Sequence, residues 1–258
     1  MPHALTADQL AAYRDEGYLV LRGRFAPAEV SELAAEAERL LARTDLIDPA
    51  NLRVRWQPHV GTGEQLFEVF DPVIDIAPAC ARVAGDARIR GALASLYGEE
   101  PCLFKDKLIY KPPGARGYGL HQDYIGWPGF PKSFVTVVVA IDPFDGSSGG
   151  TEVLPGYHKR GYLGPEDGRY HPTTDEQVPG ARAVPLDLAP GDVALFGCFL
   201  PHRSAPNASD RSRRGLFLSY NARSDGGDQR ESHYSQFHDY LRRKAPECCP
   251  HAVPQFFR

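Results

Sequence analysis

The sequence predicts a mainly β protein with flanking α-helices and a double-stranded β-helix, or jelly-roll, core. From residue 101 to about residue 222 the chain consists of short runs rich in β-branched and aromatic residues. Pro, Gly, Asp and Asn separate these runs, and no helical segments lie between them. This pattern favours an antiparallel sandwich or barrel over a parallel sheet with crossover helices.

Residues 1–258 fit a single domain, because the chain has a suitable length and no internal repeat or composition break. Its 42% of hydrophobic residues are typical of a globular enzyme with a sizeable core. We expect three parts: a helical N-terminal layer over about residues 1–100, the jelly-roll core over about residues 101–222 and a C-terminal helix over about residues 229–244.

Several elements outside the core carry their own signals. The helix in "LTADQLAAYRDEGY" has Thr6 as its expected N-cap, and the helix in "PAEVSELAAEAERLLAR" has Pro27 in its first turn. Between them, Tyr18–Leu21 is expected to form a short strand. Further helices are expected in "DARIRGALASLYG" and in "QRESHYSQFHDYLRRK".

Composition and charge exclude several classes of function. The net charge of -4 and the lack of a basic tail argue against a nucleic-acid or membrane-surface partner. The N-terminus has no secretory signal, and no apolar run reaches the roughly 20 residues of a membrane span. The five cysteines form an odd set without C-x-x-C spacing, although Cys248 and Cys249 are adjacent, so free thiols in a reducing compartment are expected. We therefore expect a cytoplasmic protein.

The stretch "GLHQDYIGW", residues 119–127, contains the first pair of candidate metal ligands. On a strand, His121 and Asp123 would share one face while Gln122 points away. A histidine and an aspartate on one face can reach the same cation. A second histidine would complete the two-histidine, one-carboxylate triad of non-haem Fe(II) sites.

His202 is the best candidate for that second histidine, because it follows the apolar strand in "PGDVALFGCFLPH". The next residues, "SAPNASDRS", are typical of a turn, and "RRGLFLSY" of a returning strand. Such a hairpin would place Arg213 beside His202. A guanidinium there could bind a carboxylate in two places, as the distal carboxylate of 2-oxoglutarate requires, and Ser204 could donate a hydroxyl to it.

The sequence resembles the phytanoyl-CoA hydroxylase-like family of Fe(II)/2-oxoglutarate dioxygenases over residues 5 to about 222. The motifs that carry the resemblance are "LTADQLAAYRDEGYLVL", "KLIYKPPG", "LHQD", "GGTEVLPGYHKRG", "PGDVALF" and "HRSAPNASDRSRRGLFLSY". The resemblance implies a hydroxylase that uses Fe(II), 2-oxoglutarate and O2 and releases succinate and CO2.

The resemblance also implies roles for individual residues. His121, Asp123 and His202 correspond to the iron ligands, and Arg213 and Ser204 to binders of the distal carboxylate of 2-oxoglutarate. Two more residues match positions at the cosubstrate, namely Gln122 and Lys107. Because the aspartate of the triad is present, hydroxylation is expected rather than halogenation.

The substrate side is predicted from strand alternation and from the flanks of the iron motif. If Arg213 points into the barrel, Asn221 and Arg223 face the mouth of the pocket. Candidates on the other side are Tyr110, Arg116 and Trp127. For the arginines a solvated loop charge, and for Trp127 simple packing, remain alternatives. These residue types suit a small polar substrate: an amino acid, a phosphonate, or a sugar- or cyclitol-like intermediate of specialised metabolism.

Two other classes of function stay open at this stage. A cupin-like isomerase or lyase would use the metal without oxygen and would not need Arg213. A β-sandwich ligand-binding module would have a structural His-x-Asp pair and no stoichiometric iron. Nothing in the sequence distinguishes a subunit interface from a helical outer layer, so no oligomeric state is predicted.

Overall fold

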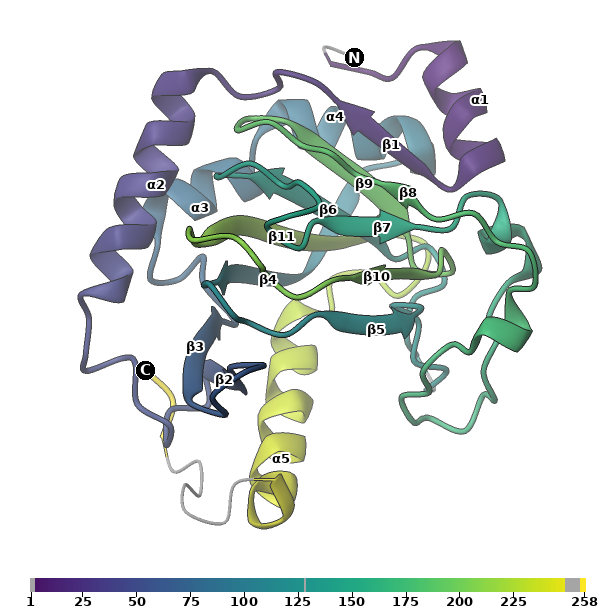
Figure 1. Ribbon diagram of the computed structural model, residues 1–258. Coiled ribbons are helices and arrows are strands. Elements are labelled where there is room, and N and C mark those ends of the chain that lie inside the picture. Colours follow the sequence, from purple (N-terminus) through teal and green to yellow (C-terminus); the bar gives the residue numbers. More distant parts are fainter. Residues whose placement is uncertain (1–2, 128, 249–255) are drawn as a thin grey trace.

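Two antiparallel sheets stacked face to face form the centre of the computed structural model, which describes residues 3–127, 129–248 and 256–258. The larger sheet contains β1 (Tyr18–Leu21), β2 (Val54–Pro58), β3 (Gln65–Phe70), β4 (Pro101–Lys111), β6 (Val135–Ala140), β9 (Val193–Gly197) and β11 (Arg213–Ala222). The smaller sheet contains β5 (Tyr118–His121), β7 (Thr151–Val153), β8 (Val184–Pro185) and β10 (His202–Ser204). Their spatial orders are β1-β9-β6-β11-β4-β3-β2 and β5-β10-β7-β8 (Figure 1). The predicted jelly-roll class is confirmed.

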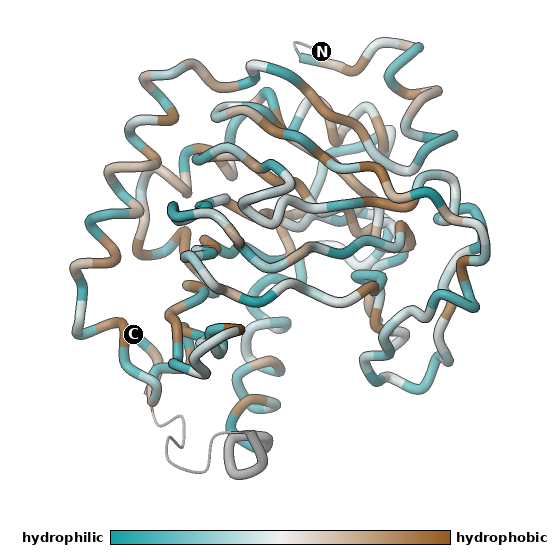
Figure 2. Tube along the Cα trace, viewed as in Figure 1, coloured by the Kyte–Doolittle hydropathy of each residue, from teal (hydrophilic) through white to brown (hydrophobic). Residues whose placement is uncertain are grey.

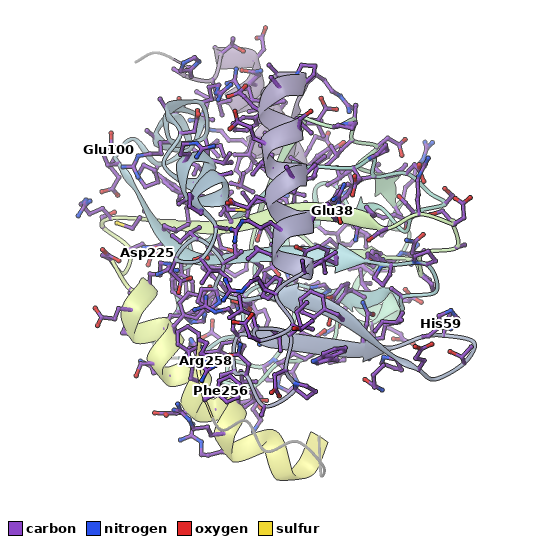
Figure 3. The ribbon with its side chains drawn as sticks, turned by 90° about the vertical axis from the view of Figure 1, so that its left-hand side faces the viewer. Glu38, His59, Glu100, Asp225, Phe256 and Arg258 are labelled. Carbon is purple, nitrogen blue, oxygen red and sulfur yellow. The ribbon has the colours of Figure 1, made fainter. Side chains whose placement is uncertain are left out.

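Helices cover the outside of this sandwich. The α-helices are α1 (Ala7–Glu16), α2 (Pro27–Leu41), α3 (Pro78–Ala84), α4 (Ala87–Tyr97) and α5 (Arg230–Cys248), and two 3-10 turns are η1 (Tyr157–Arg160) and η2 (Asp175–Gln177). α3 and α4 lie behind the larger sheet, α2 lies at its left side, and the smaller sheet lies in front of it (Figure 1). Turned by 90°, the molecule shows α2, which carries Glu38, crossing over the larger sheet (Figure 3).

Residues next to α1 fix both ends of this helix. Thr6 caps α1, since its hydroxyl accepts a hydrogen bond from the backbone N–H of Gln9 while the Gln9 side chain accepts one from the Thr6 N–H. Gly17 closes that helix with φ 86°, a left-handed conformation that glycine adopts without a steric cost. Both the Thr6 cap and the Tyr18–Leu21 strand are confirmed.

Hydrophobic residues form two main layers, one on each face of the larger sheet. Leu33 and Leu40 of α2 pack with strand residues such as Leu216 behind it. Between the two sheets, Phe144 and Phe196 fill the end of the sandwich beside β7. Hydrophobic segments run along the central strands in Figure 2, whereas the long loop between η1 and β8 is mostly hydrophilic or neutral. Within the described residues no helix is long and apolar enough to cross a membrane.

The first hundred residues are less helical than predicted. The β2–β3 hairpin extends the larger sheet beyond β4, where Val69 pairs with Ile109 (Figure 1). His59 lies near its tip, at the edge of the molecule (Figure 3). A register shift between Arg55 and Trp56 interrupts the alternation that would have revealed this strand pair in the sequence.

The C-terminal part also differs from the prediction in detail. α5 spans Arg230–Cys248 rather than about residues 229–244. Phe256 and Arg258 lie beside this helix (Figure 3), and the carbonyl of Phe256 accepts a hydrogen bond from the Leu52 N–H. Three cysteines are free and buried, namely Cys80, Cys102 and Cys198, whereas Cys249 of the adjacent pair lies outside the described residues.

The predicted hairpin between His202 and Arg213 is wrong. β10 pairs with β5 and β7 in the smaller sheet, whereas β11 pairs with β4 and β6 in the larger one. The segment "SAPNASDRS" therefore crosses from one sheet to the other instead of turning back within one sheet. As a result, His202 and Arg213 face the same interior space from opposite walls.

Two neighbouring leucines of α2 differ in burial, and this difference allows a stability test of how α2 packs on the larger sheet. Leu40 is fully buried and Leu41 is 36% exposed. Leu40→Ala should lower the free energy of unfolding by about 2–5 kcal/mol, since it leaves a cavity in the core. Leu41→Ala should cost less than about 1 kcal/mol. Urea unfolding of both variants measures this, and equal losses would show that α2 does not pack as described.

Candidate metal centre and cosubstrate pocket

A cavity between the two sheets collects most of the polar side chains that were predicted to act together. His121 and His202 reach it from the smaller sheet, and Lys107 and Arg213 from the larger sheet. Asp123 reaches it from the loop after β5. Aromatic side chains form much of the remaining wall, namely Phe104, Phe130, Phe134, Phe196 and Phe217.

The pairing of β5 with β10 brings the two histidines together. The Cα atoms of His121 and His202 are register partners in this antiparallel pair, and their ring centroids are 4.2 Å apart. The Nε2 atoms of His121 and His202 lie 3.9 Å and 3.7 Å from Oδ1 of Asp123. One ligand atom from each residue lies within 4.8 Å of the other two, so the three can hold one metal ion.

Hydrogen bonds orient each of these ligands. Nδ1 of His121 lies 2.8 Å from the carbonyl oxygen of Gly119, and Nδ1 of His202 lies 3.0 Å from that of Leu200. Each Nδ1 therefore donates its proton to a carbonyl, and the lone pair on each Nε2 faces Asp123. Because the Thr136 hydroxyl donates to Oδ2 of Asp123 at 2.6 Å, the other carboxylate oxygen remains free to bind a cation.

The electrostatics keep the ligands in the forms that bind metals. Burial lowers the pKa of His202 to about 4, so its imidazole is neutral at pH 7. Burial alone would raise the pKa of Asp123, but its interactions with the two histidines and Lys107 and the hydrogen bond from Thr136 together lower it. A neutral imidazole and an ionised carboxylate are the species that bind Fe(II).

The strand predicted over residues 119–127 is shorter than expected. β5 ends at His121, and Asp123 lies in the following loop, where the Tyr124 N–H donates to the carbonyl of Cys198. The two ligands therefore meet because the chain turns after the strand, and strand alternation does not place Asp123.

Arg213 is the strongest sign of an anionic ligand in this cavity. Its side chain is buried, and among the described residues its Nε and Nη1 have no hydrogen-bond partner. The guanidinium lies 4.1 Å from the centroid of the Phe144 ring, and burial lowers its pKa to about 10. An unpaired buried charge is costly. A carboxylate bound here would accept hydrogen bonds from this guanidinium and neutralise its charge, so the site fits 2-oxoglutarate.

Lys111 was not singled out as a site residue, although it belongs to a dense lysine group with Lys105 and Lys107. It is the register partner of Arg213, and burial and the charge of Arg213 lower its pKa to about 7. Its Nζ donates to Oγ of Ser204 at 3.0 Å and to the carbonyl of Gly149 at 3.0 Å. Lys111 therefore orients Ser204, which lines the cavity as predicted for a cosubstrate contact.

Gln122 does not reach the cavity, so its predicted contact with the cosubstrate is wrong. Its Nε2 donates to the carbonyls of Gly161 and Phe199, and its Oε1 accepts from the Leu163 N–H. Its buried side chain thus fixes the loop after η1 from the side opposite the metal ligands. Lys107, in contrast, lines the cavity.

None of the five predicted substrate contacts lines the cavity. Tyr110 faces the opposite side of β4, where its hydroxyl donates to the carbonyl of Ala37. Asn221 does not line the cavity either, and its Nδ2 donates to the backbone carbonyls of Ala222, Asp225 and Gly227. The others are Arg116 and Arg223, which are exposed, and Trp127, which packs on Phe130.

Comparison with known proteins decides the family. Residues 13–215 match the family described as Phytanoyl-CoA dioxygenase (PhyH). The chain belongs to this family. Because the match spans the β1 region, the triad and Arg213, it includes the whole constellation that the geometry brings together.

The named relatives of this dioxygenase-family chain act on small molecules. It is 28% identical to the 2-aminoethylphosphonate dioxygenase of uncultured bacterium HF130_AEPn_1, covering 94% of this chain and 90% of that one. It is 30% identical to the methylphosphonate hydroxylase of Gimesia maris, with 91% and 87% covered. Among solved structures, EctD from S. alaskensis with 2-oxoglutarate and 5-hydroxyectoine superposes with a TM-score of 0.71 at 26% identity, over 89% and 82% of the chains.

These matches support an Fe(II)/2-oxoglutarate-dependent dioxygenase over both the oxygen-independent isomerase or lyase and the binding module. When bound, iron and 2-oxoglutarate would supply the oxidising chemistry together with O2, with release of succinate and CO2. His121, Asp123 and His202 could hold the metal, and Arg213 could bind a carboxylate of the cosubstrate.

Loss of one triad member should remove the metal. His121→Ala should weaken Fe(II) binding by at least about 100-fold, because removal of a direct ligand exceeds the effect of removing its outer-shell partner. Anaerobic titration followed by the visible charge-transfer band of the Fe(II)–2-oxoglutarate complex measures this. His171→Ala is the matched control, since His171 pairs with Asp167 on a loop. Equal iron binding by His121→Ala and the control would refute the site.

Adjacent arginines offer a matched pair for the cosubstrate. Arg213→Met should raise the Kd for 2-oxoglutarate by about 100-fold, because loss of two charge-assisted hydrogen bonds costs ~3 kcal/mol. Arg214 points to the other face of β11 and pairs with Asp142 and Glu38. Arg214→Met should therefore leave this Kd unchanged in the same titration. An unchanged Kd in Arg213→Met would place the distal carboxylate elsewhere.

Proposed function

We propose that this enzyme hydroxylates a C–H bond of a small polar metabolite that carries an acidic group. In this proposal His121, Asp123 and His202 bind the iron, and Arg213 and Ser204 bind the distal carboxylate of 2-oxoglutarate. The observation that carries the proposal is the composition of the cavity beyond the triad. There an aromatic wall faces a second group of cationic and polar side chains, namely Lys105, Lys107, Ser219 and His233.

The aromatic wall suits the carbon skeleton of such a substrate. Phe130 and Phe134 lie in tilted contact, with ring centroids 5.1 Å apart. Phe104 packs edge-on against both of them, with centroid distances of 5.4 Å. These rings present an apolar surface on which a C–H group can rest close to the metal ligands, while the polar side chains beside them bind the acidic group.

The relatives support the acidic class of substrate. Two of them are named for phosphonates, 2-aminoethylphosphonate and methylphosphonate, and others for ectoine. An amino acid, a phosphonate or an acidic sugar- or cyclitol-like compound would each combine a short carbon chain with a charge that Lys105 or Lys107 can bind.

A screen of small acids tests the proposal. With Fe(II), 2-oxoglutarate and O2, at least one acid should stimulate succinate release and gain one oxygen atom, detected by mass spectrometry and derived from 18O2. Asp123→Ala should abolish both signals, because it removes a metal ligand. Turnover that continues without O2 or 2-oxoglutarate would instead favour an isomerase or lyase.

A further inference from the structure

A β-bulge turns two consecutive side chains of β4 into the cavity. Along the β4–β11 pair, Lys105 is opposite Ser219 but Leu103 is opposite Tyr220, so Phe104 has no partner of its own. Both Phe104 and Lys105 consequently line the cavity, which strict alternation would not allow. Lys105 faces the cavity by alternation with Lys107, and the bulge thus brings the aromatic ring of Phe104 in beside this cation.

The charge of Lys105 is incompletely neutralised by the protein. Its Nζ lies 3.2 Å from Oδ2 of Asp71, but the same carboxylate oxygen also accepts from Arg55. Glu68 is the other nearby carboxylate; it accepts from the Tyr118 hydroxyl, and burial raises its pKa. One firmly ionised carboxylate therefore faces both Arg55 and Lys105, and Lys107 adds a third positive charge to the region.

Burial in this excess of positive charge affects Lys105 itself. Burial, together with the charges of Lys107 and Arg55, lowers the pKa of Lys105 to about 8 against the opposing effect of Asp71. A bound anion would stabilise the charged form of Lys105 and so offset the lowering of its pKa.

His233 lies beside this cation and has a free nitrogen. The residue is 8% exposed and lines the cavity, and its ring centroid lies 4.4 Å from that of Phe104. Within the described part of the chain, its Nε2 has no hydrogen-bond partner. Burial lowers its pKa to about 3, so it is a neutral imidazole that can donate one hydrogen bond to an anionic oxygen.

We propose that Lys105 and His233 form a second anion site, which binds the phosphonate or carboxylate group of the substrate. This inference rests on the proposed function. The site is separate from that of the cosubstrate, because Ser219, opposite Lys105, is six residues along β11 from Arg213, a span of about 20 Å. One small acid cannot occupy both places.

The position of this site also limits the size of the substrate. Thr136, which donates to Asp123, pairs with Ser219, and Ser219 pairs with Lys105 on the next strand. Two strand spacings, about 10 Å, therefore separate the Cα atoms of Thr136 and Lys105. The acidic group and the oxidised carbon must fit between the Lys105 side chain and the triad, which selects short-chain acids.

Binding of defined acids to the Fe(II)–2-oxoglutarate form, without O2, tests this site. The probes are ethylphosphonate, 2-aminoethylphosphonate, propionate and β-alanine, each compared with a neutral amide or ester, and binding is followed by perturbation of the charge-transfer band. At least one acid should bind while its neutral analogue does not. Lys105→Met should raise the Kd of that acid about 10- to 100-fold, as expected for loss of a charged hydrogen bond.

Matched variants separate this effect from damage to the fold or to the cosubstrate site. Lys105→Arg should restore most of the affinity, and Lys132→Met should change nothing, since Lys132 is a surface residue with a side chain 65% exposed. The Kd for 2-oxoglutarate should stay within twofold in Lys105→Met. His233→Phe should weaken binding of the acid but leave binding of 2-oxoglutarate unchanged.

The outcomes that overturn the inference differ from those that overturn the proposed function. Acid binding that Lys105→Met leaves unchanged, equal binding of the neutral analogues, or no binding of any acid while the band forms normally would each refute the second anion site alone. Failure of the wild-type protein to give the band would refute the dioxygenase function and this inference with it. Phosphonate binding without carboxylate binding, or the reverse, identifies the acid.

Discussion

The candidate metal site depends on the antiparallel pairing of β5 with β10. This pairing sets the Cα of His202 opposite that of His121, and each ring is then fixed by a carbonyl within two residues of its own backbone. Because these contacts are local, small movements elsewhere in the chain do not reorient the rings. Only Asp123 needs support from the larger sheet, which Thr136 supplies. The site is therefore organised before a metal binds.

The positively charged side chains around the cavity differ in how completely the protein satisfies their hydrogen-bond donors. Lys111 donates to two backbone carbonyls and to Ser204, whereas two nitrogens of Arg213 have no partner in the described residues. A buried guanidinium in this state destabilises the free protein, and a carboxylate that binds it relieves the cost. The fold thus gives up some stability so that the cosubstrate binds in one orientation. Lys105 repeats this pattern more weakly, since it shares Asp71 with Arg55.

The fold class and the residues of the triad could be predicted because they leave local signals in the sequence. Short β runs indicated the sandwich, and "HQD" and the apolar run before His202 indicated the ligands. The substrate wall could not be predicted in the same way. It depends on the bulge at Phe104 in β4, which turns this aromatic side chain into the cavity beside Lys105. A single bulge does not change composition or periodicity enough to be read from the chain.

The metal ligands and the proposed substrate site are carried by different parts of the fold. The strands of the sandwich hold His121, His202 and Arg213, and the loop after β5 holds Asp123, whereas His233 comes from α5, outside the sandwich. Asp106, fully buried in β4, anchors that helix by accepting from Arg230, and it also accepts from the N–H of Val73. Because this anchor lies on the face of β4 away from the metal ligands, changes in α5 can alter the polar wall while the triad keeps its geometry. If Lys105 and His233 bind the substrate as proposed, helix packing against β4 sets substrate choice, whereas the pairing of β5 with β10 positions two of the metal ligands.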